Sequence, residues 1–226
     1  MSETASSTNA DERDVRVLLV DDHDLFRTGL RNLLEEQGVT IVGEAGSGSE
    51  ALRIVRESAP DVVIMDLNMP GMNGVDATRH ISRDAPLARV IVLTISDQEQ
   101  DVMDAILAGA CGYPLKDASI QDLMKGIEAA AVGESLISPH IAGKVLQHVR
   151  ATTAAPEAAA TIRAELSERE IQVLKLIASG NDNALIAREL HISPKTVKNH
   201  ISNILMKLQI ENRIQAAVYA VRSGIV

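Results

Sequence analysis

The segment Val62-Val-Ile-Met-Asp-Leu-Asn-Met-Pro-Gly71 decides the fold of this chain. Four apolar residues lead directly into Asp66, and Pro70-Gly71 then turns the chain. A short apolar run bounded by turn signals is typical of a strand buried on both faces of a parallel sheet. Because open α/β sheets bind their ligands at the carboxyl ends of the strands, we expect the Asp66 carboxylate to lie at a binding site.

A second acidic strand end lies upstream, where the apolar run Val15–Val20 leads into Asp21 and Asp22. The carboxyl ends of parallel strands meet at one edge of a sheet, so we expect both acids close to Asp66. Three carboxylates in one crevice repel each other unless a cation lies between them. The sequence therefore predicts a divalent metal site. The alternative is that these acids cap helices or face solvent; Asp24, for instance, could cap the first helix.

Residues 15–131 alternate strand-like and helix-like patterns with short connections, which is typical of βα units. The predicted strands are Val15–Val20, Thr40–Glu44, Val62–Met65, Val90–Thr94 and Gly112–Leu115. Helical spacing fills the intervals, and Ser119 with Asp122 resembles a capping pair that opens a fifth helix. Because crossovers between parallel strands are right-handed, the pattern predicts an α/β, doubly wound parallel sheet with helices on both faces.

A hydroxyl and an ammonium group arrive at the same edge, because Thr94 ends the fourth predicted strand and Lys116 follows the fifth. Mg²⁺ takes oxygen ligands in octahedral geometry, keeps several waters and bridges to phosphate. A metal and a lysine neutralise the charge on a phosphoryl group while a carboxylate attacks it in line. This set of side chains is therefore suited to a phosphoryl group carried on Asp66.

The charge of the chain is unevenly distributed. The 226 residues carry a net charge of −9, yet residues from Ile162 onward include nine Lys/Arg and only six Asp/Glu. The part before Ile162 holds thirteen basic and twenty-five acidic residues. An acidic front and a basic end indicate two domains with different partners, and the basic end is the candidate for binding nucleic acid.

Composition argues against a membrane or secreted protein. No apolar run approaches the ~20 residues that span a bilayer. Residues 1–14 lack the apolar core of a signal peptide, and we expect them to form a disordered leader. The single cysteine, Cys111, precludes an internal disulfide and fits a reducing compartment, so we expect the protein to be cytoplasmic.

The basic end is predicted to consist of four short helices. Capping signals at Ser167–Glu170 and at Ser193-Pro194 start the first and the third helix. The second is expected at about Asn183 to Leu190, and the fourth at Arg213 to Val221. Two helices joined by a tight turn, the second of them rich in lysine, are typical of a helix-turn-helix.

The acidic edge closely resembles the receiver domain of two-component response regulators. The resemblance rests on Asp21, Asp22, Asp66, Pro70-Gly71, Thr94 and Lys116. It implies a flavodoxin-like sheet of five strands in the order 2-1-3-4-5. It also implies that a sensor histidine kinase phosphorylates Asp66. Mg²⁺ would then be held by Asp22, Asp66 and the carbonyl of Asn68, with Asp21 reaching the ion through water.

The roles of the other receiver positions are implied by the same resemblance. Lys116 would pair with the phosphoryl group, and Thr94 would turn inward to hydrogen-bond it. Tyr113 matches the aromatic residue that changes rotamer together with this threonine. Asn68 and Ser96 occupy the positions that tune hydrolysis of the phosphoaspartate.

The basic end resembles the LuxR/NarL-type DNA-binding domain. The matching segments are Leu166-Ser-x-Arg-Glu170, Ile186-Ala187, Ser193-x-x-Thr-Val-Lys-Asn-His200 and Lys207-Leu208. The resemblance implies phosphate contacts from Lys195, Thr196, Asn203 and Lys207. Lys198 and Asn199 are the candidate base readers, since Lys can donate to guanine and Asn can pair with adenine. The alternative is that the lysines form an ordinary solvated helix face.

The domain boundaries follow from these patterns. We expect a receiver over residues 15–131, a linker with one helix (Pro139 to Arg150) over 132–161, and an all-α helix-turn-helix domain over 162–226. Three features depart from the families. Pro114 interrupts the fifth predicted strand, Ala184-Leu185 replaces a common Lys-Glu pair, and Ser202 stands where a basic residue is common. We therefore expect weak DNA binding by the monomer and a dependence on dimerisation.

A receiver followed by this DNA-binding module is the architecture of the NarL/FixJ branch of response regulators. The resemblance therefore implies a transcription factor that binds promoter DNA as a homodimer once phosphorylated, and not a turnover enzyme. Two alternatives remain open. One is a phosphotransfer enzyme that uses Asp66 as its nucleophile, although such phosphatases need an acid where Asn68 stands. The other is a DNA-binding regulator whose receiver senses a ligand or is purely structural.

Overall fold

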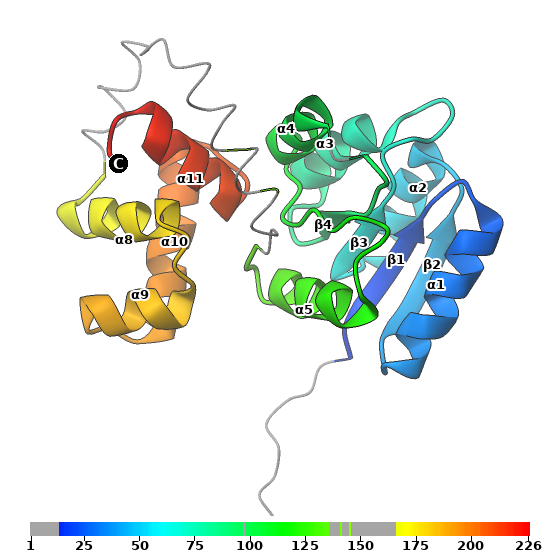
Figure 1. Ribbon diagram of the computed structural model, residues 1–226, viewed down its shortest axis with the longest axis horizontal. Coiled ribbons are helices and arrows are strands. Elements are labelled where there is room, and N and C mark those ends of the chain that lie inside the picture. The colour runs from blue at the N-terminus through cyan, green and yellow to red at the C-terminus, as the bar shows by residue number, and fades with distance from the viewer. Residues whose placement is uncertain (1–13, 97, 136–140, 142–144, 146–165) are drawn as a thin grey trace, which may run out of the picture.

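The computed structural model describes residues 14–96, 98–135, 141, 145 and 166–226. These residues form an α/β domain and a helical domain that lie side by side (Figure 1). Most of the predicted leader and linker, including the helix predicted at Pro139–Arg150, lies outside the described residues. Within that helix only Ile141 and Val145 are described, and both are helical and buried. No helix in the described ranges is long and apolar enough to cross a membrane.

The α/β domain is built on a parallel sheet. Its strands are β1 (Arg16–Val20), β2 (Thr40–Ala45), β3 (Val62–Met65) and β4 (Arg89–Val92). They pair in the order β2-β1-β3-β4, which confirms the predicted parallel, doubly wound arrangement. β3 lies in the middle of the sheet and all four of its residues are buried, as its unbroken apolar sequence predicts.

The predicted fifth strand, Gly112–Leu115, is wrong as a regular element. This segment pairs with the β4 side of the sheet only through isolated bridges, Ile91 to Gly112 and Thr94 to Leu115, so the described sheet has four strands. The physical reason is Pro114, which has no backbone N–H for a regular ladder. Backbone hydrogen bonds on either side, such as Lys116 N to Thr94 O at 2.9 Å, still hold the segment at the edge.

Five helices cover the two faces of the sheet. They are α1 (Asp24–Glu36), α2 (Gly48–Ser58), α3 (Gly74–Asp84), α4 (Glu99–Leu107) and α5 (Ile120–Ala131). α1 and α5 pack on one face, whereas α2 and α3 pack on the other and α4 continues beside α3. Separate apolar clusters fill the space under each face. The predicted capping pair is confirmed, because the Ser119 side chain accepts a hydrogen bond from Asp122 N at the start of α5.

The helical domain consists of α8 (Glu168–Ala178), α9 (Asn183–Leu190), α10 (Pro194–Leu208) and α11 (Arg213–Arg222). Both predicted starts are confirmed: Ser167 forms a capping box with Glu170, and Ser193 caps α10 with Pro194 in its first turn. His191 adopts the left-handed conformation (φ 53°) and turns the chain between α9 and α10. The two helices therefore have the helix-turn-helix arrangement.

The two domains contact each other through α4 and α11 (Figure 1). Ile214 and Val218 of α11 are buried in the same apolar cluster as Val102 and Ile106 of α4. Polar contacts flank this cluster: Asn212 Nδ2 donates to Ala110 O at 3.0 Å, and Gln215 Nε2 donates to Ile106 O at 2.9 Å. One face of the last helix is thus covered by the α/β domain.

Candidate functional sites at the sheet edge and on helix α10

The parallel register brings the predicted acids together. Val20 pairs with Met65, and Asp66 N donates to Val20 O at 2.8 Å, so Asp21 and Asp66 leave adjacent strands at the same level. On the other side of β3, Leu93 N donates to Met65 O at 2.9 Å, which places Thr94 beside the same edge. Strand pairing therefore brings Asp21, Asp66 and Thr94 to the same edge of the sheet.

Lys116 bridges the two buried carboxylates. Its Nζ lies 2.6 Å from Asp21 Oδ2 and 3.2 Å from Asp66 Oδ2. The side chains of Lys116, Asp21 and Asp66 are only 13%, 6% and 4% exposed. The ammonium group also lies 4.5 Å from the centre of the Phe26 ring, which adds a cation–π contact. A fixed positive charge thus lies against the carboxylate that is the candidate nucleophile.

Burial raises the pKa of the Asp66 carboxyl above its ordinary value. The charge and hydrogen bond of Lys116 lower this pKa in opposition, while the negative charge of Asp21 raises it further. Leu67 N also donates to Asp66 Oδ1 at 2.9 Å, which favours the ionised form. The Asp66 carboxylate is therefore poorly solvated, and a further cation placed beside it would lower its pKa.

The site has the donor set of a divalent metal centre. Asp21, Asp22, His23 and Asp66 each offer one ligand atom, and these atoms all lie within 4.8 Å of one another. Asp22 Oδ1 is buried and accepts no hydrogen bond from any described residue, although the imidazole Nδ1 of His23 lies 2.9 Å from it. A buried carboxylate oxygen next to two further carboxylates suits Mg²⁺, which prefers oxygen ligands. From the sequence, His23 is expected beside the acidic pocket, where it could contact a phosphoryl donor or be an ordinary loop residue, and not among the metal ligands.

His23 lies close to both acids of the loop. Its Nδ1 is 3.2 Å from Asp21 Oδ1 and 2.9 Å from Asp22 Oδ1, whereas its backbone N–H donates to Asp21 Oδ1 at 2.8 Å. The turn after β1 is therefore held by contacts within the acidic loop itself. Proximity along the chain is the only sequence signal that points to this histidine.

The predicted switch residues lie next to one another at the same edge. Thr94 is fully buried, and its Oγ1 accepts a hydrogen bond from Ser96 N at 3.3 Å. The Tyr113 ring is buried as well, and its hydroxyl donates to Ser96 O at 3.1 Å. The Ser96 loop thus links the threonine to the tyrosine. Asn68 lies exposed in the loop after Asp66.

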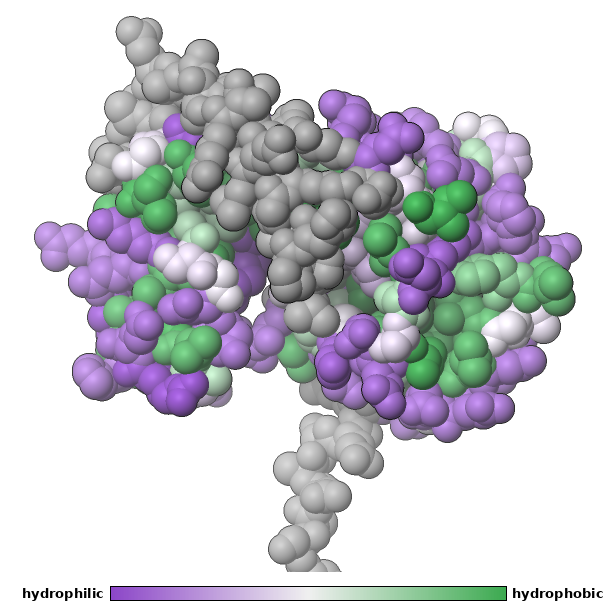
Figure 2. All heavy atoms as spheres, viewed as in Figure 1, coloured by the Kyte–Doolittle hydropathy of each residue, from purple (hydrophilic) through white to green (hydrophobic). Residues whose placement is uncertain are grey.

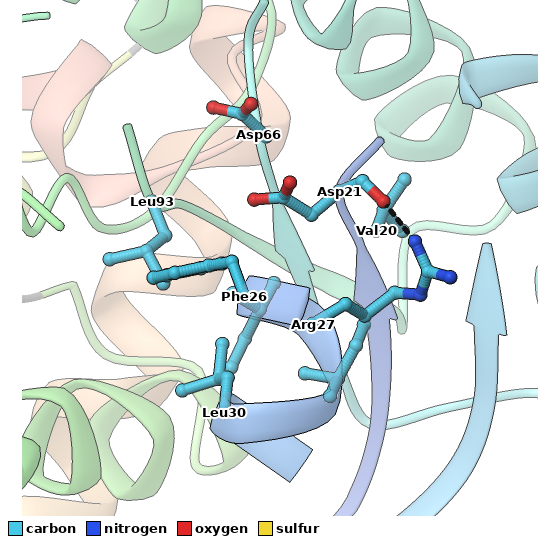
Figure 3. Close-up of a pocket in the computed structure, with 9 residues that line it drawn as sticks. Val20, Asp21, Phe26, Arg27, Leu30, Asp66 and Leu93 are labelled. Carbon is cyan, nitrogen blue, oxygen red and sulfur yellow. Dashed lines mark hydrogen bonds between the residues drawn. The ribbon is translucent and has the colours of Figure 1, made fainter. Parts of the chain in front are cut away.

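Arg27 is a residue at this site that the sequence does not single out. Its Nη1 donates to the backbone carbonyl of Asp21 at 2.5 Å, its Nη2 to Asp24 Oδ1 at 2.5 Å and its Nε to Glu44 Oε2 at 3.1 Å. Figure 3 shows the Asp21 carboxylate directed towards Asp66 and its carbonyl oxygen directed away, to the guanidinium. The place of Arg27 in the sequence, seven residues after the end of β1, gives no indication of this contact.

The helix α10 presents part of the predicted DNA-binding set. Lys195, Asn199 and Asn203 are exposed on it, and Thr196 Oγ1 lies 2.8 Å from the hydroxyl of the cap residue Ser193. Two lysines have partners within the protein. Lys198 Nζ lies 3.5 Å from Val132 O, just after α5. Lys207 Nζ lies 2.7 Å from Oε2 of buried Glu170, so this lysine takes part in a structural ion pair.

Comparison with protein families agrees with the geometry of both domains. Residues 17–128 match the response regulator receiver domain, and residues 164–220 match the bacterial regulatory proteins of the luxR family. A receiver joined to a LuxR-type helix-turn-helix defines the class of response regulators that carry a DNA-binding domain.

Full-length relatives narrow this class. The transcriptional regulatory protein LiaR of Bacillus subtilis is 43% identical over 215 residues, covering 94% of this chain and 99% of LiaR. The response regulator VraR of Staphylococcus aureus is 38% identical, and the nitrate/nitrite response regulator NarL of Escherichia coli is 36% identical, with coverage of 93% or more on both sides. The chain belongs to the NarL/FixJ family of response regulators.

Solved structures show the same architecture. The crystal structure of ChrA, a response regulator of a heme-sensing two-component system, matches with a TM-score of 0.52 and 35% identity over 94% of this chain and 99% of ChrA. The structure of an RcsB–DNA complex matches with a TM-score of 0.55 and 27% identity, covering 92% of this chain and 98% of RcsB.

Proposed function

We propose that this response regulator accepts a phosphoryl group on Asp66 from a sensor histidine kinase and converts it into control of transcription. The observation that supports this most directly is the contact of Lys116 with both Asp66 and Asp21 at the sheet edge. A structural or ligand-sensing receiver has no need for a buried carboxylate, a second acid and a lysine at this spacing. We further propose that the protein acts in the cytoplasm.

In the proposed reaction, the Asp66 carboxylate attacks the phosphorus of a phosphohistidine in line. The new O–P bond forms as the P–N bond breaks, and the imidazole of the donor leaves. Asp22, Asp66 and the Asn68 carbonyl would hold Mg²⁺, with Asp21 reaching it through water, and this ion supplies charge neutralisation for the phosphoryl oxygens. Lys116 then moves from the carboxylates to a phosphoryl oxygen, and the Thr94 hydroxyl donates to another.

Loss of the phosphoryl group would return the protein to its resting state. We propose that water hydrolyses the acyl phosphate slowly without a partner enzyme, and that Asn68 and Ser96 set the rate. Asn68 is exposed beside the nucleophile, and Ser96 N bonds Thr94 Oγ1. These positions support the proposal that both residues affect how water reaches the phosphoryl group.

A groove beside the site offers a place for the kinase. It lies between α1 and α5, encloses about 260 Å³, and is lined by Leu25, Leu30, Leu33 and Ile120 as well as by Lys116. Leu25 is 89% exposed and Leu33 is 49% exposed. Figure 2 shows apolar side chains gathered on this face of the α/β domain. A kinase docked there would bring its phosphohistidine next to Lys116 and Asp66.

We propose that the signal reaches the DNA-binding domain through Tyr113. Its ring belongs to the same buried cluster as Val102 and Ile106 of α4 and Ile214 and Val218 of α11. Movement of Thr94 towards a phosphoryl group would leave room for the Tyr113 ring, which repacks and loosens α11 from α4. The freed α11 face would then be available to a second copy of the chain.

Two helix-turn-helix domains in a homodimer would bind a two-fold promoter site, with affinity that falls steeply with salt. We assign phosphate contacts to Lys195, Thr196 and Asn203, and base contacts to Lys198 and Asn199. Lys207, which the sequence also predicts to contact DNA, would have to leave its ion pair with Glu170 to do so.

The direct test is incubation of the full chain with Mg²⁺ and a small acyl phosphate donor. We expect the wild type to gain one acid-stable, base-labile phosphate and Asp66→Ala to gain none. Asp84→Asn, which changes an exposed acid on α3, should label like the wild type. Equal labelling of wild type and Asp66→Ala, or no labelling of the wild type, would contradict the proposal.

A further inference from the structure

We propose that Arg27 is a positioning residue that orients the Asp21-Asp22 pair for Mg²⁺. This inference rests on the proposed function, because it assigns a role at the same phosphorylation site. None of the hydrogen bonds that Arg27 forms with described residues ends on a carboxylate oxygen of Asp21 or Asp22. Arg27 donates instead to the backbone carbonyl of Asp21 and to the carboxylates of Asp24 and Glu44.

The contact with Asp21 fixes the turn from which both acids project. Asp21 N donates to Ala45 O at 3.1 Å, and Asp21 O accepts from Arg27 at 2.5 Å. Both backbone polar groups of Asp21 are therefore held, one by β2 and the other by α1. With its backbone held on both sides, the Asp21 carboxylate points towards Asp66 (Figure 3). Asp22 follows directly on the same restrained turn.

Arg27 is suited to this role because it is itself held from three sides. Its side chain is 15% exposed, and its partners come from the loop after β1, the start of α1 and the strand β2. The charges of Asp24 and Glu44 balance the guanidinium. A lysine cannot reproduce this arrangement, since an ammonium lacks the planar fork that reaches several acceptors at once. Lys116, by contrast, bonds the Asp21 carboxylate directly and has to leave it during the reaction.

The chain provides a matched control in Arg31, one turn further along α1. Arg31 Nη1 bonds Glu44 at 2.8 Å and its Nε bonds Glu35 at 2.9 Å, so it shares the Glu44 partner of Arg27. Within the part of the chain that the structure describes, the hydrogen bonds and ion pairs of Arg31 end on side chains of α1 and β2 and not on the acidic loop. Losing Arg31 removes a comparable ion pair without releasing Asp21.

The experiment measures Mg²⁺ affinity of the full chain by isothermal titration calorimetry, together with urea unfolding of each variant. Arg27→Met should weaken Mg²⁺ binding about tenfold, as is common for residues that orient metal ligands. Arg31→Met should stay within about twofold of the wild type even if it lowers stability similarly. Should Arg27→Met not fold, Arg27→Lys decides the question: a loss of about threefold or more supports positioning, and unchanged affinity overturns it.

Two results would contradict the proposal: wild-type Mg²⁺ affinity in the Arg27 variant, or an equal loss of affinity in the Arg31 variant. The second result would mean that Arg27 acts only through general stability. Failure of the phosphorylation proposal is recognised separately, since it concerns labelling of the wild type at Asp66. A wild type that binds Mg²⁺ but takes no phosphate leaves the comparison of Arg27 with Arg31 fully interpretable.

Discussion

Gly74 shows how a single residue restrains the loop that follows Asp66, the proposed phosphorylation site. It opens α3, and its backbone N–H donates to Leu67 O at 3.0 Å, which closes the loop that follows Asp66. A Cβ atom at this position would overlap the backbone carbonyl of Asp66 and the Cα of Leu67. Because these neighbours are main-chain atoms of a buried segment, they cannot move aside without displacing the Asp66 carboxylate. Glycine is therefore required here for close approach.

We expect Gly74→Ala to lower the free energy of unfolding by about 1–3 kcal/mol and to slow phosphorylation at Asp66. The matched control is Gly29→Ala in α1, where an added methyl meets nothing within 4 Å. That change should raise stability by about 0.5–1 kcal/mol, because alanine favours the helix. Urea unfolding and acyl phosphate labelling measure both effects. A Gly74 variant as stable and as reactive as the wild type would show that the loop can shift freely.

At the scale of the element, α8 and α10 are joined by the ion pair of Glu170 and Lys207. Burial favours the neutral form of Glu170, yet the hydrogen bonds from Lys207 and from Ser167 outweigh it and lower the pKa of this carboxyl. Glu170 is also the third residue of α8 and completes its capping box. One side chain therefore caps the start of α8 and ties this helix to α10.

The lowered pKa gives a pH dependence with a defined sign. A carboxyl with a lower pKa in the folded state stabilises the protein above its unfolded pKa, and this contribution is lost as the pH falls through the folded value. We expect Glu170→Gln to reduce stability by about 1–3 kcal/mol at pH 7. The difference from the wild type should shrink below pH 4.5, the ordinary value for this group. Thermal unfolding followed by circular dichroism tests this, and a difference that stays constant down to pH 3 would contradict it.

Much of this element-level structure is predictable from the residues. The apolar run before Asp66, the caps Ser119 and Ser193, and the glutamate three residues after Ser167 all act locally, so each fixes its element through its own neighbours. The paired acids are also predictable, since parallel strands deliver their ends to one edge. Pro114 shows where prediction from the sequence stops. The sequence shows that this residue lacks a backbone N–H donor, but whether the edge segment still forms a strand depends on its pairing with β4.

The residues that the sequence does not reveal are those whose partners come from elsewhere in the fold. The contact of Arg27 with Asp21 requires α1 to pack against the β1 end at one particular rotation. The partner of Lys207 depends on how α10 crosses α8. Gly74 meets Asp66 only after the loop between them has closed. Such contacts are consequences of tertiary packing, which no local pattern encodes.

At the scale of the whole molecule, the cover of α11 by α4 links the two domains. Gln215 Nε2 donates to Ile106 O at 2.9 Å, and the adjacent apolar contact buries Ile214 and Val218. One face of α11 cannot pack against the α/β domain and against a second copy of the chain at the same time. We therefore expect the unphosphorylated protein to dimerise weakly, and so to bind DNA weakly.

We expect Gln215→Ala to raise the DNA affinity of the unphosphorylated protein about two- to thirteenfold, since an interdomain hydrogen bond contributes roughly 0.5–1.5 kcal/mol. Gln172→Ala on α8, where the Gln172 side chain accepts a hydrogen bond from Arg169 of the same helix, should leave this affinity unchanged. Fluorescence anisotropy with promoter DNA at fixed salt measures it. An affinity of the Gln215 variant equal to or below that of the wild type would argue against α11 release as the regulated step.

The lone thiol sits on the segment that carries Tyr113 and Lys116. Cys111 is buried, its Sγ–H donates to Val90 O at 3.3 Å, and burial raises the pKa of the thiol to about 12. We therefore expect Cys111 not to react with an alkylating reagent while its segment stays attached to β4. Because the chain has one cysteine, the rate at which Cys111 is alkylated would report how often the segment that carries it detaches from β4.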